Sequence, residues 1–265
     1  GLTAAAASEI VRPFDFYPSP MSDSASSIAF PLAPRKGDLT RAAIVEAALL
    51  AASRGGLEGL TIGTLADSMQ MSKSGVFAHF GSREELQLAV LKAYVQRFVD
   101  EVLRPAVKKP RGLPRLEAIL QRWVAFLARE MTRGCIMIAG AVEYDDVPGP
   151  QRDEMVAIIT GWKRELIKAI RQAVSEGHLK PRIDAHQLVF EIYGLMLAMH
   201  QDARLLRSAD SAKRARTGLR RLIDNVRVSS LNSKRAPSRA EPASLTKPSR
   251  VHGRREASRT RAAKE

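Results

Sequence analysis

Three helix-start signals follow one another in the first third of the chain, and they limit this region to short helices. Thr61, Ser72 and Ser82 each precede an apolar segment, and each carries a hydroxyl that can accept a hydrogen bond from a first-turn N–H. Gly81 ends the second segment, and Ser82 with Glu85 forms a capping box. Helices confined between such closely spaced signals have only two or three turns. A long helix is therefore excluded from this region.

Longer helical patterns lie on both sides. Upstream, Thr40 is the predicted N-cap and Gly55-Gly56 the stop of a helix whose apolar face is Ile44, Ala47, Ala48 and Ala51. Downstream, a helix is predicted to end at Pro105, with an apolar face of Leu91, Tyr94, Val95, Phe98 and Val102. Two short helices joined across residues 69–71, with a further helix packed behind them, form a helix-turn-helix. That motif places its second short helix in the major groove of DNA.

The first turn of this second helix has the chemistry of a DNA contact. Its residues are Lys73, Ser74 and Gly75. Lys73 can reach a base edge or a phosphate, Ser74 can do either, and Gly75 lets the backbone approach closely. Free N–H groups and the partial positive charge of a helix N-terminus favour the same approach. The alternative for Lys73 is a solvated lysine.

The residues from Leu60 to Leu86 resemble the DNA-binding domain of the tetracycline-repressor (TetR) family. The shared pattern is a Thr, four residues, an Ala, a short turn, a Ser, an aromatic-x-(His/Tyr)-Phe motif and an x-x-(Lys/Arg)-Glu-x-Leu motif. The resemblance as a whole extends beyond this stretch and covers about 60 of the 265 residues. It implies DNA contacts from Thr61, Lys73, Ser74, Gly75, Phe77, His79 and Arg83.

Several of these positions have a second interpretation. Phe77 stands where the family often has Tyr, and without the hydroxyl it is expected to be half core. His79 either donates to a phosphate or caps the helix end. The positive charge of Arg83 is unfavourable beside the positive end of a helix dipole, and a phosphate partner would explain an arginine at this position. Arg35 and Lys36 precede the first helix and either follow the DNA backbone or minor groove, or form a loose arm.

The region after Pro114 is also helical in pattern. Helices are expected from Leu116 to Leu127, over residues 135–141, from Met155 to Gly177, after an Asp184–Gln187 capping box, and over residues 210–226. The helix after Asp184 is apolar on almost every side, so it must be covered on both sides. A second copy of the chain is the natural cover. The family resemblance implies a homodimer with a four-helix interface, and its two-fold symmetry implies a palindromic operator.

Aromatic, Met and Cys side chains recur in this second region and are candidate walls of a ligand pocket. Residues of these types at helical spacing are also ordinary core, which is the alternative for each of them. Taken together they favour a small apolar ligand, and no buried charge identifies it further. The candidates are Trp123, Phe126, Met131, Cys135, Met137, Met155, Trp162, Phe190, Tyr193 and Met196.

The ends of the chain differ in composition from the middle. We expect an unstructured segment over residues 1–34, the DNA-binding domain over 35–86, a ligand-binding and dimerisation domain over 87–227, and a basic disordered tail over 228–265. A start at Met21 is an alternative. Half of the formal charge of +14 lies in the tail. The tail is either a solvated segment or a non-specific DNA tether.

The remaining composition excludes several classes. The single Cys135 excludes a disulfide framework and a Cys-cluster metal site, and it fits the cytoplasm. The apolar stretch Leu188–Met199 is too short to span a bilayer, so no membrane partner is expected. No catalytic, cofactor or metal motif is recognised. We therefore predict an all-α, dimeric, ligand-responsive repressor that binds double-stranded DNA; the alternatives are an activator or a nucleoid-type protein held by its tail.

Overall fold

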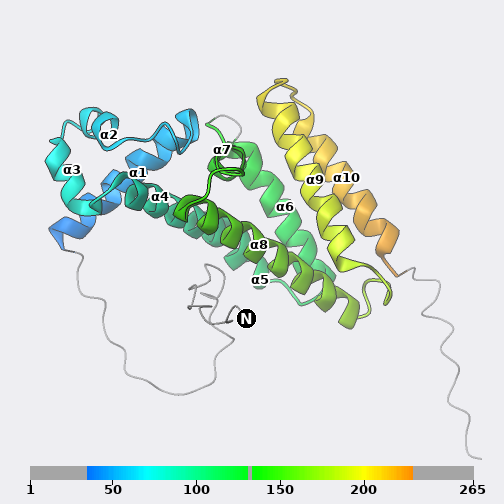
Figure 1. Ribbon diagram of the computed structural model, residues 1–265. Helices are drawn as coiled ribbons and strands as arrows, with labels where there is room; N and C mark the ends of the chain where they lie inside the picture. Colours follow the sequence, from blue (N-terminus) through cyan, green and yellow to red (C-terminus); the bar gives the residue numbers. More distant parts are fainter. Residues whose placement is uncertain (1–34, 131–132, 229–265) are drawn as a thin grey trace, which may run out of the picture. The chain divides into compact units, whose positions relative to one another are not determined.

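A computed structural model describes residues 35–130 and 133–228 (Figure 1). In these two ranges every named secondary-structure element is a helix. An isolated β-bridge pairs Leu179 with Arg227. The predicted all-α fold class is thereby confirmed. Within the same ranges no helix is long and apolar enough to cross a membrane. The predictions made for residues 1–34, for Met131 and for the tail from residue 229 onward lie outside the described residues.

Three helices form the N-terminal part: α1 (Lys36–Gly55), α2 (Ile62–Ser68) and α3 (Lys73–Phe80). Thr61 Oγ1 accepts from Thr64 N at 3.1 Å, and Ser72 Oγ accepts from Gly75 N at 3.0 Å, so both predicted caps are present. The predicted cap Thr40 is wrong, because α1 begins one turn earlier. Its hydroxyl donates instead to the Lys36 carbonyl at 3.0 Å inside the helix. Sequence alone missed that first turn because it carries no apolar periodicity.

The turn between α2 and α3 contains a residue in a strained backbone conformation. Gln70 adopts a positive φ of 54°, in the left-handed region where glycine is usual. Gly81 follows α3 with φ 74° and ends it, because its N–H returns to the Phe77 carbonyl at 2.7 Å. These two residues fix the length and direction of α3.

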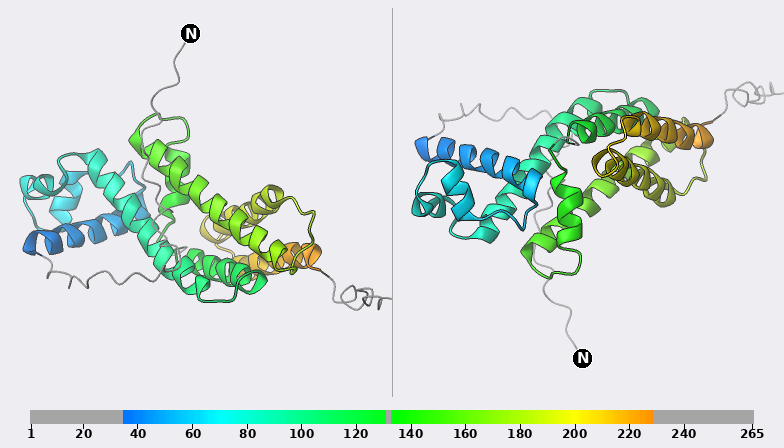
Figure 2. Two further views of the ribbon diagram at one scale, coloured as in Figure 1. Left: turned by 90° about the horizontal axis from the view of Figure 1, so that it is seen from below. Right: turned by 90° about the horizontal axis from the view of Figure 1, so that it is seen from above.

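A long helical segment joins the two halves of the chain. It consists of α4 (Arg83–Phe98), a π-helical turn η1 (Val99–Leu103) and α5 (Arg104–Val107). The predicted end at Pro105 is wrong, because Pro105 occupies the first turn of α5, where its missing N–H costs nothing. The domain boundary expected at residues 86/87 falls inside α4. Figure 2 shows α4 extending from the α1–α3 group into the C-terminal helices.

The C-terminal part contains α6 (Leu113–Glu130), α7 (Ile136–Glu143), α8 (Pro150–Ser175), α9 (Ala185–Arg204) and α10 (Ser211–Val226). Asp184 caps α9 by accepting from the N–H groups of His186 and Gln187 at 2.9 and 3.0 Å. The reciprocal half of the predicted capping box is not formed, because the Gln187 side chain donates to Glu191 at 3.0 Å. Helices α9 and α10 pack side by side (Figure 1).

One continuous hydrophobic core runs through all of these helices. Its fully buried residues include Ile44 on α1, Leu91 on α4, Leu116 on α6 and Ile170 on α8. Because α4 contributes core residues to both halves, a displacement of α4 is felt in the helix-turn-helix and in the C-terminal helices alike.

Candidate DNA-binding site and ligand pocket

The first turn of α3 is open to solvent and lies beside the start of α2. Lys73 and Ser74 are exposed, while Gly75 and Thr61 are half-buried. A Cβ placed on Gly63 would lie 3.4 Å from Lys73 Cε, so the lysine stem crosses the beginning of α2. The arrangement brings together the N-termini of two helices, each of which favours an anion.

The other predicted DNA-contact residues are either accessible at the surface or, in the case of Arg83, engaged in contacts within the protein. Arg35 and Lys36 are exposed at the start of α1, and His79 is half-buried in the last turn of α3, where a cation suits the helix dipole. Phe77 is 52% exposed, so about half of its surface is covered by the protein, as expected of a half-core residue. An exposed phenyl ring on a recognition helix can contact a thymine methyl group.

Arg83 is engaged within the protein. Its Nε donates to the Leu60 carbonyl at 2.9 Å, its Nη2 donates to the Glu58 carbonyl, and Nη2 pairs with Glu58 Oε1 at 2.9 Å. These contacts hold the loop between α1 and α2 against the start of α4. They also offset the unfavourable dipole that Arg83 meets at a helix N-terminus, which was the reason for expecting a phosphate there.

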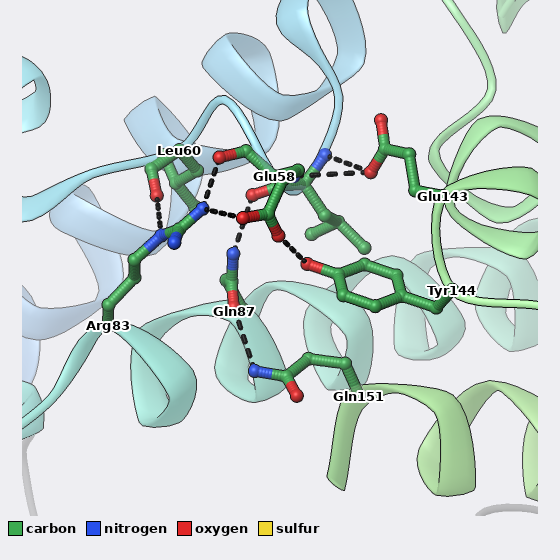
Figure 3. A network of polar contacts seen from close by, with 8 residues as sticks. Glu58, Leu60, Arg83, Gln87, Glu143, Tyr144 and Gln151 are labelled. Atoms are coloured by element: carbon green, nitrogen blue, oxygen red, sulfur yellow. Dashed lines mark hydrogen bonds and ion pairs between the residues drawn. The ribbon is translucent and has the colours of Figure 1, made fainter. Parts of the chain in front are cut away.

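The same loop is held from the C-terminal half by a group of polar contacts, here called the Glu58 network: Glu58, Arg83, Gln87, Glu143, Tyr144 and Gln151 (Figure 3). Tyr144 donates its hydroxyl proton to Glu58 Oε2 at 2.8 Å. Glu143 Oε2 accepts from the backbone N–H groups of Leu57 at 2.9 Å and Glu58 at 3.2 Å. Sequence reasoning missed this network, because its members are up to about ninety residues apart.

A buried chain of amides completes the Glu58 network. Gln87 Nε2 donates to the Leu57 carbonyl at 2.7 Å, and Gln151 Nε2 donates to Gln87 Oε1 at 2.8 Å. Gln87 is only 2% exposed, so this satisfied pair is costly to disturb. Gly56 adopts φ 78°, and a Cβ there would overlap Glu143 Oε1. A side chain at this position would therefore be strained and would displace the Glu143 carboxylate from the loop.

Charge within the Glu58 network is set by hydrogen bonding. The hydrogen bond from Tyr144, followed by that from Arg83, lowers the pKa of Glu58. Burial, and then the hydrogen bond to Glu58, raises the pKa of Tyr144. Both shifts keep Glu58 ionised and Tyr144 protonated near neutral pH, which is the state in which the hydroxyl donates.

A cavity of about 70 Å³ lies among α4, α6, α7, α8 and α9. Seven of the ten predicted pocket residues line it: Trp123, Phe126, Cys135, Met137, Trp162, Tyr193 and Met196. Two do not. Met155 is buried core against Gly140, and Phe190 is 70% exposed on the outer face of α9. The sequence missed Tyr94 and Phe98, which line the cavity, because their helix was assigned wholly to core packing.

Aromatic rings form a continuous series along the cavity wall. Trp162 meets Phe98 at 4.8 Å and Trp123 at 5.0 Å between ring centroids, both edge to face. Phe126 contacts Phe98 at 5.2 Å and Tyr94 at 5.7 Å in the same manner. Such rigid aromatic walls are typical of sites for small apolar molecules.

Polar groups at the cavity are few and uncharged. The Tyr94 hydroxyl and Cys135 Sγ are 3.3 Å apart and form a hydrogen bond. Burial raises the pKa of Cys135 and raises that of Tyr193 to about 12, so both remain neutral at physiological pH. The cysteine is accordingly no activated nucleophile. Among the described residues, no group of three His, Cys, Asp or Glu side chains is placed to hold a metal ion.

A capped, solvent-open recognition helix, with a second helix crossing behind it, defines a helix-turn-helix DNA-binding protein. Residues 44–90 match the family model for bacterial regulatory proteins of the tetR family, and residues 112–219 match that for the tetracyclin repressor-like C-terminal domain. The protein belongs to the TetR family of transcriptional regulators. A comparison with curated protein sequences finds no match.

Solved structures of the same fold align with this chain over nearly all of their own length. A TetR regulator from Chloroflexus aurantiacus J-10-FL aligns with a TM-score of 0.65 at 25% identity, over 74% of this chain and 100% of that one. A TetR-family regulator from Cytophaga hutchinsonii aligns with a TM-score of 0.65 at 20% identity, over 75% and 100%. A regulator from Saccharomonospora viridis in complex with choline aligns with a TM-score of 0.60 at 18% identity, over 72% and 99%.

Proposed function

We propose that the protein is a ligand-responsive transcriptional repressor. It binds a palindromic operator as a homodimer, and a small apolar ligand in the cavity releases it from DNA. The observation that carries this proposal is the first turn of α3, where Lys73 and Ser74 are exposed beside the start of α2. Thr61, Phe77 and His79 extend the same contact. Arg35 and Lys36 add backbone contacts from α1.

Dimerisation is supported by an unpartnered apolar stripe on α9. Phe190, Gly194 and Leu197 follow one another at helical spacing, and the two large side chains are 70% and 45% exposed. Gly194 has open space above it, so a second helix can approach closely at that point. Exposed apolar surface of this kind marks protein interfaces. A copy of the same stripe on a two-fold axis is the natural occupant.

Coupling between ligand and DNA is supported by the positions of the cavity and the Glu58 network. Helix α4 carries Tyr94 and Phe98 at the cavity and Gln87 in the Glu58 network. Helix α8 likewise carries Trp162 at one site and Gln151 at the other. A ligand that favours a different position of α4 or α8 therefore changes how the loop before α2 is held. The change in operator affinity can be no larger than the ligand's differential affinity for the two states.

The test is selection of bound duplexes from a random pool with the full chain. The proposal predicts a two-fold symmetric consensus whose half-sites are about one helical turn apart. The same selection with residues 229–265 removed should return the same consensus, because the tail contributes sequence-independent affinity. Recovery of random sequences by the full chain would contradict the proposal and favour a nucleoid-type protein.

A further inference from the structure

One side chain that lines the cavity carries a buried polar atom without a partner. Trp162 is 4% exposed, and among the described residues its indole Nε1–H has no hydrogen-bond acceptor. The rings around it, Phe98 and Trp123, meet it edge to face and offer no oxygen or nitrogen acceptor. A buried donor without an acceptor is unfavourable in any folded protein. A bound molecule with an acceptor atom would relieve that cost.

The charge around the cavity restricts the ligand further. No Asp, Glu, Lys or Arg is among the lining residues, so an ionised ligand would be desolvated without a counter-charge. Lys163 Nζ already lies 4.8 Å from the ring centroid of Tyr193, and the Arg129 guanidinium lies 5.8 Å from that of Phe126. Two lining rings thus already interact with a cation of the protein. A cationic ligand beside these rings would lie near a like charge, which is unfavourable.

The size of the cavity restricts it as well. A volume of about 70 Å³ is well below the roughly 300–1,000 Å³ of pockets that hold drug-sized molecules. Met137 and Met196 at the wall are flexible side chains that can move to admit more volume. The ligand is therefore compact, on the order of a single ring.

We propose that the cavity binds a compact, neutral, largely apolar molecule that presents one hydrogen-bond acceptor, such as a carbonyl oxygen, to the indole N–H of Trp162. This deepens the proposed function, on which it rests for its regulatory meaning, by naming the chemical class of the ligand. The acceptor distinguishes this ligand from a plain hydrocarbon. Neutrality distinguishes it from a carboxylate or an ammonium ion.

The test compares four one-ring probes with the full chain: cyclohexanone, its hydrocarbon counterpart methylenecyclohexane, cyclohexanecarboxylate and cyclohexylammonium. The chain has two Trp, and both line the cavity, so intrinsic fluorescence reports binding directly. Calorimetry gives an independent affinity. We expect cyclohexanone to bind about fivefold more tightly than methylenecyclohexane, the effect of one hydrogen bond. The two ionised probes should bind at least tenfold more weakly than the ketone.

Two variants locate the acceptor site. Trp162→Phe removes the N–H and should abolish the preference for the ketone, while methylenecyclohexane still binds. Trp123→Phe is the comparison variant: it removes the other indole of the cavity and should change the affinity for both neutral probes, but it should keep the ketone-to-hydrocarbon ratio, because the Trp162 N–H is still present. If Trp162→Phe does not fold, the indole N–H resonances of the wild-type chain answer the same question. Cyclohexanone, and not methylenecyclohexane, should then shift the Trp162 signal downfield.

Three results would overturn the inference: an unchanged ketone preference in Trp162→Phe, ionised probes that bind as tightly as the ketone, or no binding of either neutral probe at millimolar concentration. Operator binding is measured separately. If cyclohexanone binds through Trp162 but leaves operator affinity unchanged, the ligand class stands and the proposed repressor mechanism fails.

Discussion

Lys73 owes its position to two local features of the sequence. Ser72 caps α3 immediately before it, and Gly63 leaves room for its stem over α2. Both features act within about ten residues, so the sequence predicted the caps at Thr61, Ser72 and Ser82 correctly. The partner of Arg83 could not be predicted in this way. Glu58 lies 25 residues earlier, and only the folded chain brings the two side chains together.

Replacing Lys73 with Ala should weaken operator binding by about 1–3 kcal/mol, because it removes a base-edge or phosphate contact. Competition binding at fixed salt measures the change, and circular dichroism confirms that the fold is kept. Lys92→Ala is the matched control, since Lys92 is an exposed lysine on α4 and carries the same charge. Equal losses for the two variants would leave only general electrostatics and remove Lys73 from the recognition surface.

The stability of the protein should decrease as pH falls below about 6.5. Burial, and then the nearby Arg204 charge, lowers the pKa of His200, so the folded chain binds the proton more weakly than the unfolded chain. Protonation therefore favours unfolding, and stability is greatest above the unfolded pKa. Urea denaturation at pH 7.5 and about pH 5.5 measures the difference. His200→Gln should reduce it; an identical pH dependence would assign the effect to other groups.

At the scale of elements, the loop between α1 and α2 is held from α4, α7 and α8 together. The sequence predicted these helices by their apolar periodicity, but it carries no local signal for contacts between them. Glu143, Tyr144 and Gln151 lie outside the helices predicted over residues 135–141 and from Met155 to Gly177, so no pattern marked them as contact residues. The helical segment of α4, η1 and α5 also continues past Pro105, because Pro105 lies in the first turn of α5, where a proline is tolerated.

Tyr144→Phe tests the role of the Glu58 network. Loss of the hydroxyl should lower the free energy of unfolding by about 0.5–1 kcal/mol, a modest amount because the Glu58 carboxylate is solvent-exposed. The same substitution should reduce the ligand-induced change in operator affinity by a larger factor than this loss of stability corresponds to. The control is Ile223→Val in the buried face of α10, expected to cost about 0.5–1.5 kcal/mol. If both variants lose the response equally, the network contributes stability alone.

At the scale of the whole molecule, the C-terminal helices and seven of the cavity-lining residues could be predicted from the sequence. Apolar periodicity located the helices, and residue type selected seven of the lining residues. The two errors have a physical reason. Met155 and Phe190 have the same composition signal as the others, and only the rotation of α8 and α9 about their axes decides which side chains face inward.

Phe190→Glu should dissociate the proposed dimer, because it introduces a charge into the apolar α9 stripe and, by symmetry, into the partner's copy of the stripe. Sedimentation at micromolar concentration measures the change, and operator affinity should fall with it. Val142→Glu on α7 is the matched control, since Val142 is equally exposed, at 72%, outside α9 and α10. A dimer that survives Phe190→Glu would place the interface elsewhere.

The central claim is that α3 reads base sequence, and the ratio of two dissociation constants tests it most directly. The full chain is titrated, at one physiological salt concentration, with its best selected duplex and with a scrambled duplex of the same length and composition. The account predicts that the selected duplex binds at least about a thousandfold more tightly. Equal affinity for the two duplexes would contradict it, because phosphate contacts and the net charge of +14 would then suffice for all DNA binding.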